Sequence, residues 1–343
     1  MSSAKSTIES TESAVPAGGE TSAAADGGTE TPVATAKPHS PAKFGVTDIG
    51  LVFMAAIWGG HYTVLKIGLQ TMEPFTFSAI RMLGALIILS VLVLTVRDTP
   101  RPSSQDIKGL LLIGLLGNGV YQLLFMVGMT TTRAGIAALI IAASPAWVAI
   151  IGRLLGKERV AARGWTGIGL QLLGVVCVVL STHALEASGG AAVGTVLILI
   201  CGIVWSTYTV LLQPYTTRVH PLHLATITLA SGATLMFFAA LPGLMRLDVA
   251  KVAPEAWWAL SYSTIFAMII AYLLYYRGIR VIGPTRTAVY GNLQPVIAII
   301  VAWVMLHEAP AFWQWIGTAL IMAGLLISRS APVKPITDTH PIP

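Results

Sequence analysis

Polar and aromatic side chains recur at helical spacing inside the apolar segments of this 343-residue chain. In two sets they stand at positions i, i+3 and i+4, which places them on one face of a helix. The sets are Trp58, His61 and Tyr62, and Trp205, Tyr208 and Thr209. Each begins about ten residues into its segment, near the mid-depth of a membrane at about 1.5 Å per residue. We therefore expect both sets to line a central binding cavity. An aromatic belt at the membrane interface is the alternative.

Two further sets combine phenols with amides. They are Asn118, Tyr121 and Gln122 in one segment, and Tyr272, Tyr275 and Tyr276 in another. An amide in hydrocarbon is costly unless it is hydrogen-bonded, so these side chains either bond neighbouring helices or face water. Because the two sets lie at nearly the same depth, we interpret them as further cavity lining. We expect all of them except Tyr275 to contact a bound substrate.

Prolines interrupt two apolar segments at matching places. Pro295 follows Asn292 and Gln294, and Pro145 follows Ser144. A proline cannot donate to the carbonyl four residues earlier, so each one leaves an acceptor free and kinks its helix. Interrupted helices at equivalent places in two halves are typical of a central binding site. We expect Asn292 and Gln294 to face the interior; a passive kink, healed by Ser144 or Gln294, is equally compatible.

Charged side chains are almost absent from the apolar segments, and no Asp or Glu lies deep in any of them. Arg81 lies about two turns into its segment. There it either bonds backbone carbonyls, which we favour, or pairs with a substrate carboxylate. His61 is the one deep group that titrates near neutral pH, and we expect it to be neutral and hydrogen-bonded. These side chains predict no metal, no cofactor and no catalytic residue.

The elements that position these residues are helices of membrane length. Apolar residues make up 55% of the chain and charged residues 10%, against about 25% charged in soluble domains. Windows of about 20 apolar residues, enough for a hydrocarbon core about 30 Å thick, predict ten spans. These are 48–68, 75–96, 107–127, 134–155, 164–182, 193–213, 222–243, 257–276, 285–306 and 312–329.

A repeat divides these spans into two halves. Residues 62–65 and 208–211 both read Tyr-Thr-Val-Leu, and Pro145 and Pro295 are among the residues that recur about 150 positions apart. A doubled block of apolar segments is typical of transporters built from two structural repeats. Each half has an odd number of spans, so the second half enters the membrane from the opposite side. The expected fold class is an all-α membrane protein with ten transmembrane helices in two inverted five-helix repeats.

Composition and charge set the boundaries and the orientation. We expect the first repeat at residues 44–183 and the second at residues 190–330. Residues 1–43 hold no apolar run, which is typical of a disordered tail, and residues 331–343 form a second tail. If the amino terminus is inside, sixteen Lys and Arg residues fall on inside segments and four on outside segments. This bias places both tails in the cytoplasm.

In these segments the chain resembles the EamA-type transporters of the drug/metabolite transporter superfamily, over residues from about 48 to 329. The runs that carry the resemblance are AIRMLGALIIL, SPAWVAIIGRLLGKE, QPVIAIIVAWVMLHE, WTGIGLQLLGVVCVVL and WIGTALIMAGLLIS. The resemblance implies a carrier that moves small metabolites, often outward, through a cavity between the halves. The family includes exporters of amino acids. One departure is Thr228, which matches Arg81 in the second half, so any role of that arginine is one-sided.

The expected function is that of a carrier, in the direction of export, for small metabolites such as amino acids. An integral-membrane enzyme acting on a lipid-soluble substrate is the alternative, but it would need clustered carboxylates or histidines at one membrane face. A channel would need a ring of charges or of carbonyls. The expected partners are a small-molecule substrate and the bilayer of the inner (plasma) membrane, with no nucleic acid. A monomer is compatible with the sequence.

The coupling of transport to a driving force has two readings in the sequence. If proton exchange drives the carrier, His61 is the best group to carry the proton, because Arg81 stays charged. Facilitated diffusion down a substrate gradient is the simpler account. We favour diffusion, because one histidine on an aromatic face is more often a hydrogen-bonding wall residue than a proton shuttle.

Topology mapping tests the inverted arrangement. Reporter fusions after residues 69, 187 and 310 should report from the outside, and fusions after residues 100 and 160 from the cytoplasm, because the Lys and Arg bias sets the orientation. Alkaline phosphatase and green fluorescent protein activities at each fusion point provide the measurement. A fusion after residue 187 that reports from the cytoplasm would contradict an odd number of spans per half.

Overall fold

A computed structural model of the chain describes residues 45–95, 100–155, 158–159, 162–185, 189–282, 284–291, 293–329 and 334–335. The predicted amino-terminal tail lies outside these residues, as does most of the predicted carboxyl-terminal tail. The described part of the chain is helical, apart from two strands of two residues each. These are β1 (Glu158–Arg159) and β2 (Lys334–Pro335), which pair antiparallel.

The helices of the first half are α1 (Val46–Gly68), α2 (Pro74–Thr95), α3 (Ser104–Gly114), η1 (Leu115–Val120), α4 (Tyr121–Thr131), α5 (Ala134–Ala142), α6 (Ser144–Leu154) and α7 (Ala162–Leu185). Those of the second half are α8 (Gly189–Thr216), α9 (Pro221–Met245), η2 (Val249–Lys251), α10 (Pro254–Tyr262), η3 (Ser263–Ile270), α11 (Ala271–Ile282), α12 (Pro284–Gly291), α13 (Leu293–Leu306) and α14 (Phe312–Arg329). In α3–η1–α4 a π-helical turn joins two α-helices, and α10–η3–α11 repeats this arrangement.

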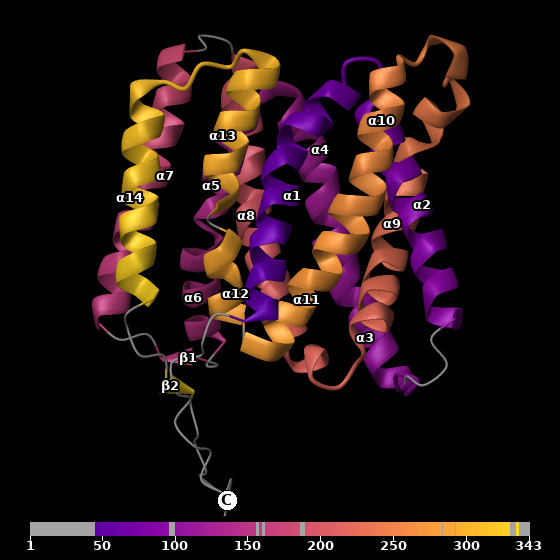
Figure 1. Cartoon of the computed structure of the whole chain (residues 1–343), viewed down its shortest axis with the longest axis horizontal. Coiled ribbons are helices and arrows are strands. Elements are labelled where there is room, and N and C mark those ends of the chain that lie inside the picture. The colour runs from indigo at the N-terminus through magenta and orange to yellow at the C-terminus, as the bar shows by residue number, and fades with distance from the viewer. Residues whose placement is uncertain are drawn as a thin grey trace, which may run out of the picture. The chain divides into compact units, whose positions relative to one another are not determined.

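Membrane-length helices dominate the structure. By length and composition, seven stretches of the described chain are able to cross a membrane: α1, α2, α3–α4, α5–α6, α8, α9 and α10–α11. α13 is apolar but shorter. Figure 1 shows the helices of residues 44–343 standing side by side in one bundle. The prediction of an all-helical membrane protein is therefore confirmed.

The contacts between helices repeat when each first-half helix is exchanged for its second-half counterpart. α1 packs on α13, and α8 packs on α6. α4 packs on α8, and α11 packs on α1. α2 and α9 pack on each other, as do α7 and α14. This exchange is the pattern expected of two structurally equivalent halves that share one interface.

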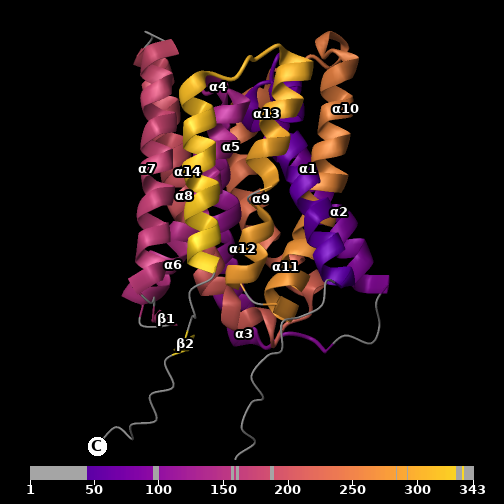
Figure 2. The ribbon, with the colours of Figure 1, turned by 60° about the vertical axis from the view of Figure 1, so that its left-hand side comes forward.

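Glycines bring α7 and α14 into close contact, and the two helices lie beside each other in both views (Figure 1, Figure 2). A Cβ atom on Gly174 would lie 2.8 Å from the carbonyl oxygen of Gly317, and one on Gly324 would lie 2.5 Å from that of Gly167. Small residues permit such close backbone approach between membrane helices. Neither helix contributes to the cavities described below, so α7 and α14 form a packed pair beside the rest of the bundle.

A further close approach fixes α1 at the centre of the bundle. A Cβ atom on Gly59 would lie 2.8 Å from the Cβ of Ile297 and 2.9 Å from the carbonyl oxygen of Gln294. Because position 59 carries no side chain, α1 rests directly on α13. This contact places the adjacent Trp58 at the level of Gln294, where the central cavity lies.

The glycine contacts of α7 predict a specific loss of stability. Gly174→Ala should lower the free energy of unfolding by about 1–3 kcal/mol, because the added methyl group overpacks the contact with α14. Gly169→Ala in the same helix is the control, since a Cβ atom there meets nothing within 4 Å. Thermal unfolding of the purified variants measures both. Equal stability of the two variants would contradict the assigned packing.

Candidate functional site

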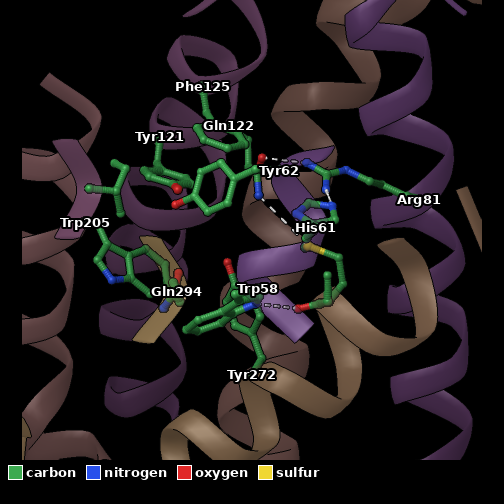
Figure 3. Close-up of a pocket in the computed structure, with 13 residues that line it drawn as sticks. Trp58, His61, Tyr62, Arg81, Tyr121, Gln122, Phe125, Trp205, Tyr272 and Gln294 are labelled. Atoms are coloured by element: carbon green, nitrogen blue, oxygen red, sulfur yellow. Dashed lines mark hydrogen bonds between the residues drawn. The ribbon is translucent and has the colours of Figure 1, made fainter. Parts of the chain in front are cut away.

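A central cavity of about 70 Å³ lies among the helices of the bundle. Most of its lining is aromatic or polar, and Figure 3 shows these side chains converging from helices of both halves. The lining residues are Trp58, His61, Tyr62, Arg81, Tyr121, Gln122, Phe125, Ile141, Trp205, Ala267, Met268, Tyr272 and Gln294. The candidate binding residues Trp58, His61, Tyr62, Tyr121, Gln122, Trp205, Tyr272 and Gln294 thus lie together at one place.

Two tryptophans at equivalent positions of the halves meet at this cavity. The rings of Trp58 and Trp205 lie 5.9 Å apart between centroids and are nearly perpendicular, at 88°. Tyr272 packs edge-on against both rings. The Trp58 indole N–H donates to the carbonyl of Ala267 at 3.0 Å, inside the π-helical turn η3. Edge-to-face pairs stabilise their own geometry, so this cluster fixes the lower wall of the cavity in Figure 3.

A second aromatic group forms the opposite wall. Tyr121 and Phe125 of α4 stack with their centroids 5.4 Å apart and their planes 12° apart. Tyr62 of α1 meets the edge of Phe125, at 5.9 Å and 69°. Tyr121 also contacts Trp205, which links the two walls. The cavity therefore offers flat apolar faces with hydroxyl groups at their edges, a lining suited to a small amphipathic molecule.

Arg81 of α2 reaches into the same space although its residue is completely buried. Its Nη2 donates to the Gln122 side-chain oxygen at 2.8 Å and to the Ser78 hydroxyl at 3.4 Å, and its Nη1 donates to His61 Nε2 at 3.1 Å (Figure 3). These acceptors are side chains, so the preference for backbone carbonyls was wrong. The physical reason is that helices α1 and α4 supply neutral acceptors in the cavity, far from Arg81 in sequence.

The partners of Arg81 fix the state of His61. A guanidinium has only N–H donors, so His61 Nε2 accepts from it and the ring proton lies on Nδ1. The Ser263 hydroxyl, 3.0 Å from the same Nε2, then donates as well. A second ring proton, on Nε2, would make His61 a cation 3.1 Å from the Arg81 guanidinium. The geometry therefore agrees with the expectation of a neutral, hydrogen-bonded histidine.

The charge of Arg81 has no carboxylate partner among the described residues. Its hydrogen-bonding partners are all neutral, and its Nε atom has no hydrogen-bond partner. The ring of Phe77 lies 5.9 Å from the guanidinium carbon, which adds a cation–π contact. Neutral acceptors satisfy N–H groups but leave the positive charge in place, and a buried charge without a counter-ion is costly.

A smaller cavity of about 40 Å³ adjoins the first. The two share Trp58, Ile141, Trp205 and Gln294 as lining residues. Pro145 and Ser144 line the smaller cavity, where α5 ends and α6 begins. The Ser144 hydroxyl donates to the carbonyl of Ile141, which the proline leaves without its helical donor. The carbonyl freed by the proline is therefore hydrogen-bonded, and the junction of α5 and α6 still lines the smaller cavity.

In the second half, α12 ends at Gly291 and α13 begins at Leu293, on either side of Asn292. Gln294 lines both cavities, and Pro295 is buried in α13. Asn292 lies outside the described residues.

Three candidate residues lie away from both cavities. The Tyr208 and Tyr276 hydroxyls bond each other at 2.6 Å, buried between α8 and α11. Asn118 is buried in the π-helical turn η1, where it packs against Gly232 of α9. Conversely, two polar residues of the site were not among the candidates, Arg81 and Ser263. Arg81 carried the visible signal of a charge inside an apolar segment, whereas nothing in its local sequence distinguishes Ser263.

Charged groups connect helix ends at one end of the bundle. Lys66, near the end of α1, lies 3.7 Å from a carboxylate oxygen of Glu308, which follows α13. The other carboxylate oxygen of Glu308 accepts from the backbone N–H of Ala134 at 3.1 Å, at the start of α5. A carboxylate at a helix amino terminus is favourable. This one side chain thereby ties together the ends of α1, α5 and α13.

Comparisons with known proteins point to one family. The model of the EamA-like transporter family matches residues 46–180 and again residues 192–330. An uncharacterized transporter of Archaeoglobus fulgidus is 28% identical over 83% of this chain and 97% of its own length. The uncharacterized inner membrane transporter YedA of Escherichia coli K12 is 27% identical over 82% of this chain and 90% of its own. A crystal structure with 18% identity has a TM-score of 0.61, covering 82% of this chain and 97% of that one, which shows a like fold.

The hydrogen bonds of Arg81 predict unequal roles for two cavity glutamines. Gln122→Leu should lower the free energy of unfolding by about 1–3 kcal/mol, because it removes an acceptor from a buried cation. Gln294→Leu is the control and should stay within about 0.5 kcal/mol, since Gln294 lines the same cavity but is not a hydrogen-bond partner of Arg81. Thermal unfolding followed by tryptophan fluorescence compares them. A loss as large for Gln294→Leu as for Gln122→Leu would contradict this network.

Proposed function

Because the chain belongs to the EamA-like transporter family, we propose that it is a carrier that exports a small organic metabolite, such as an amino acid, by alternating access to its central cavity. The family and the relatives establish the coarser statement, that the chain is a multi-pass membrane transporter and not an enzyme. The cargo, the outward direction and the alternation are the proposal. The alternative of an integral-membrane enzyme has no support among these relatives.

The observation that carries the proposal is the position of the cavity. Trp58 and Trp205, at equivalent positions of the two halves, meet in its lining. A site on the interface between two repeats changes its exposure when one repeat rocks against the other. A cavity within one half would keep its exposure during such a motion.

The proposed architecture has ten membrane helices, in repeats at residues 44–183 and 190–330, with both termini in the cytoplasm. Two observations support it. The helix contacts exchange between the halves, as an approximate twofold axis requires. The excess of Lys and Arg on one side of the predicted spans supports the orientation. With an odd number of helices in each repeat, the axis lies in the membrane plane and the repeats are inverted.

Alternating access requires that the ends of the bundle open in turn, and two features of the structure are suited to such opening. The contacts of Glu308 with Lys66 and with the start of α5 close the end of the bundle that the proposed topology places outside. The break between α5 and α6 lies beside the smaller cavity. Chain breaks of this kind absorb the backbone rotation of a hinge. Release of the Glu308 contacts, with bending between α5 and α6, would open the cavity outward.

The geometry of His61 supports transport down a substrate gradient rather than proton exchange. His61 Nε2 already accepts from Arg81, so a proton there requires the guanidinium to move away. A carrier of this kind exchanges substrate in either direction and needs no pH gradient. The sequence led us to favour the same account.

Counterflow in proteoliposomes tests the proposed function. Vesicles loaded with an unlabelled candidate should accumulate the labelled molecule transiently and saturably, without a pH gradient. Trp58→Ala should reduce the initial rate about tenfold or more, because it removes an aromatic anchor from the cavity. Trp303→Ala is the matched control, since Trp303 of α13 is exposed on the surface of the bundle. A flux that never saturates, or equal rates for the two variants, would contradict a carrier with a central site.

A further inference from the structure

We propose that Arg81 selects the charge of the transported molecule, and that the substrate is a small organic monoanion whose carboxylate binds this guanidinium while its apolar body lies against the aromatic walls. The inference rests on the proposed carrier function and makes its substrate class specific. It departs from an amino acid in one respect, because a free amino group is not required.

The first step is the unbalanced charge. Arg81 is completely buried, lines the cavity and has only neutral hydrogen-bonding partners among the described residues. Its Nε atom, on the edge of the guanidinium, has no partner. His61 accepts from Arg81 and is therefore neutral, so it does not repel an anion. The lining of the cavity thus carries one positive charge and no negative charge.

The second step is the chemistry that such a site attracts. A positive charge inside low-dielectric walls raises the local concentration of anions and excludes cations. The planar guanidinium matches a carboxylate, with parallel N–H groups along one edge. A bound carboxylate would supply the missing counter-ion. It would also pair a buried charge that is costly on its own. A bound substrate would therefore stabilise this state of the carrier.

The third step concerns the rest of the molecule. The walls opposite Arg81 are the stacked Tyr121 and Phe125, and the Trp58–Trp205 pair. The cavity lining contains no carboxylate to pair with an ammonium group; its other polar groups are amides, phenols, indoles and one imidazole. A zwitterion would therefore leave its ammonium unpaired, whereas an apolar monoanion satisfies the site. The matching place in the second half holds Thr228 and the Tyr208–Tyr276 pair, so the recognition is one-sided.

Binding is measured apart from transport, with four probes that share a phenyl ring and differ in charge: 3-phenylpropionate, phenylalanine, phenethylamine and 3-phenylpropanol. Trp58 and Trp205 line the site, so the intrinsic fluorescence of the purified protein in nanodiscs reports its occupancy. We expect saturable binding of 3-phenylpropionate and at least about tenfold weaker binding of the cation and the alcohol. Arg81→Gln should weaken 3-phenylpropionate binding about tenfold or more and remove the preference over 3-phenylpropanol.

Two further variants separate recognition from folding. Arg81→Lys keeps the charge and should retain the preference for the anion, with reduced affinity because it lacks the planar fork. Arg246→Gln is the control, because this arginine is exposed beyond the end of α9, and it should bind as wild type does. Gel filtration and thermal unfolding establish that each variant is folded. If Arg81→Gln does not fold, the wild-type order of the probes and the Arg81→Lys result still decide.

The outcomes distinguish this inference from the proposed function. Equal wild-type binding of phenethylamine and 3-phenylpropionate overturns the charge selection, even if counterflow shows a carrier. Binding of phenylalanine alone overturns the claim that no amino group is needed. Anion-selective binding that Arg81→Gln abolishes, without any counterflow, upholds the charge selection and overturns the carrier.

Discussion

The structure depends on the burial of one cation in the middle of an apolar bundle. A guanidinium in hydrocarbon is expensive, and a protein retains it only where partners meet its N–H groups. Here two partners come from other helices, His61 on α1 and Gln122 on α4, and Ser263 of η3 is bonded to His61. The third partner, Ser78, lies one turn earlier on α2. These bonds set the relative heights of α1, α2 and α4. Of these helices, α1 and α4 present aromatic side chains to the cavity.

The two halves share a pattern and differ in chemistry. Both contain a π-helical turn at the equivalent place, η1 in the first half and η3 in the second, and both supply a tryptophan to the centre. The first half adds the charged and amide groups, whereas the second fills the matching region with hydrogen-bonded phenols. Repetition therefore accounts for the interface between the halves. The side chains in which the halves differ are those on which the proposed recognition of an anion depends.

Much of the fold and part of the site could be predicted from the sequence. Regular helical spacing placed Trp58, His61 and Tyr62 on one face, and α1 is an uninterrupted helix, so all three line the cavity. Asn118 and Gln122 were expected to share a face, but the π-helical turn η1 widens the helix between them and turns Asn118 toward α9. The partners of Arg81 depend on contacts between distant helices, which no local pattern reveals. Tyr276 lies on a regular helix but meets Tyr208 away from the cavity.

The most direct test of alternating access is the reactivity of a single cysteine at position 294, which faces both cavities. Gln294→Cys, in a background from which Cys177 and Cys201 have been removed, is treated with a membrane-impermeant thiol reagent from one side of the membrane at a time. The account predicts labelling from either side, with rates that a saturating substrate changes in opposite directions. Labelling from one side alone, with or without substrate, would contradict a central site that both faces of the membrane reach in turn.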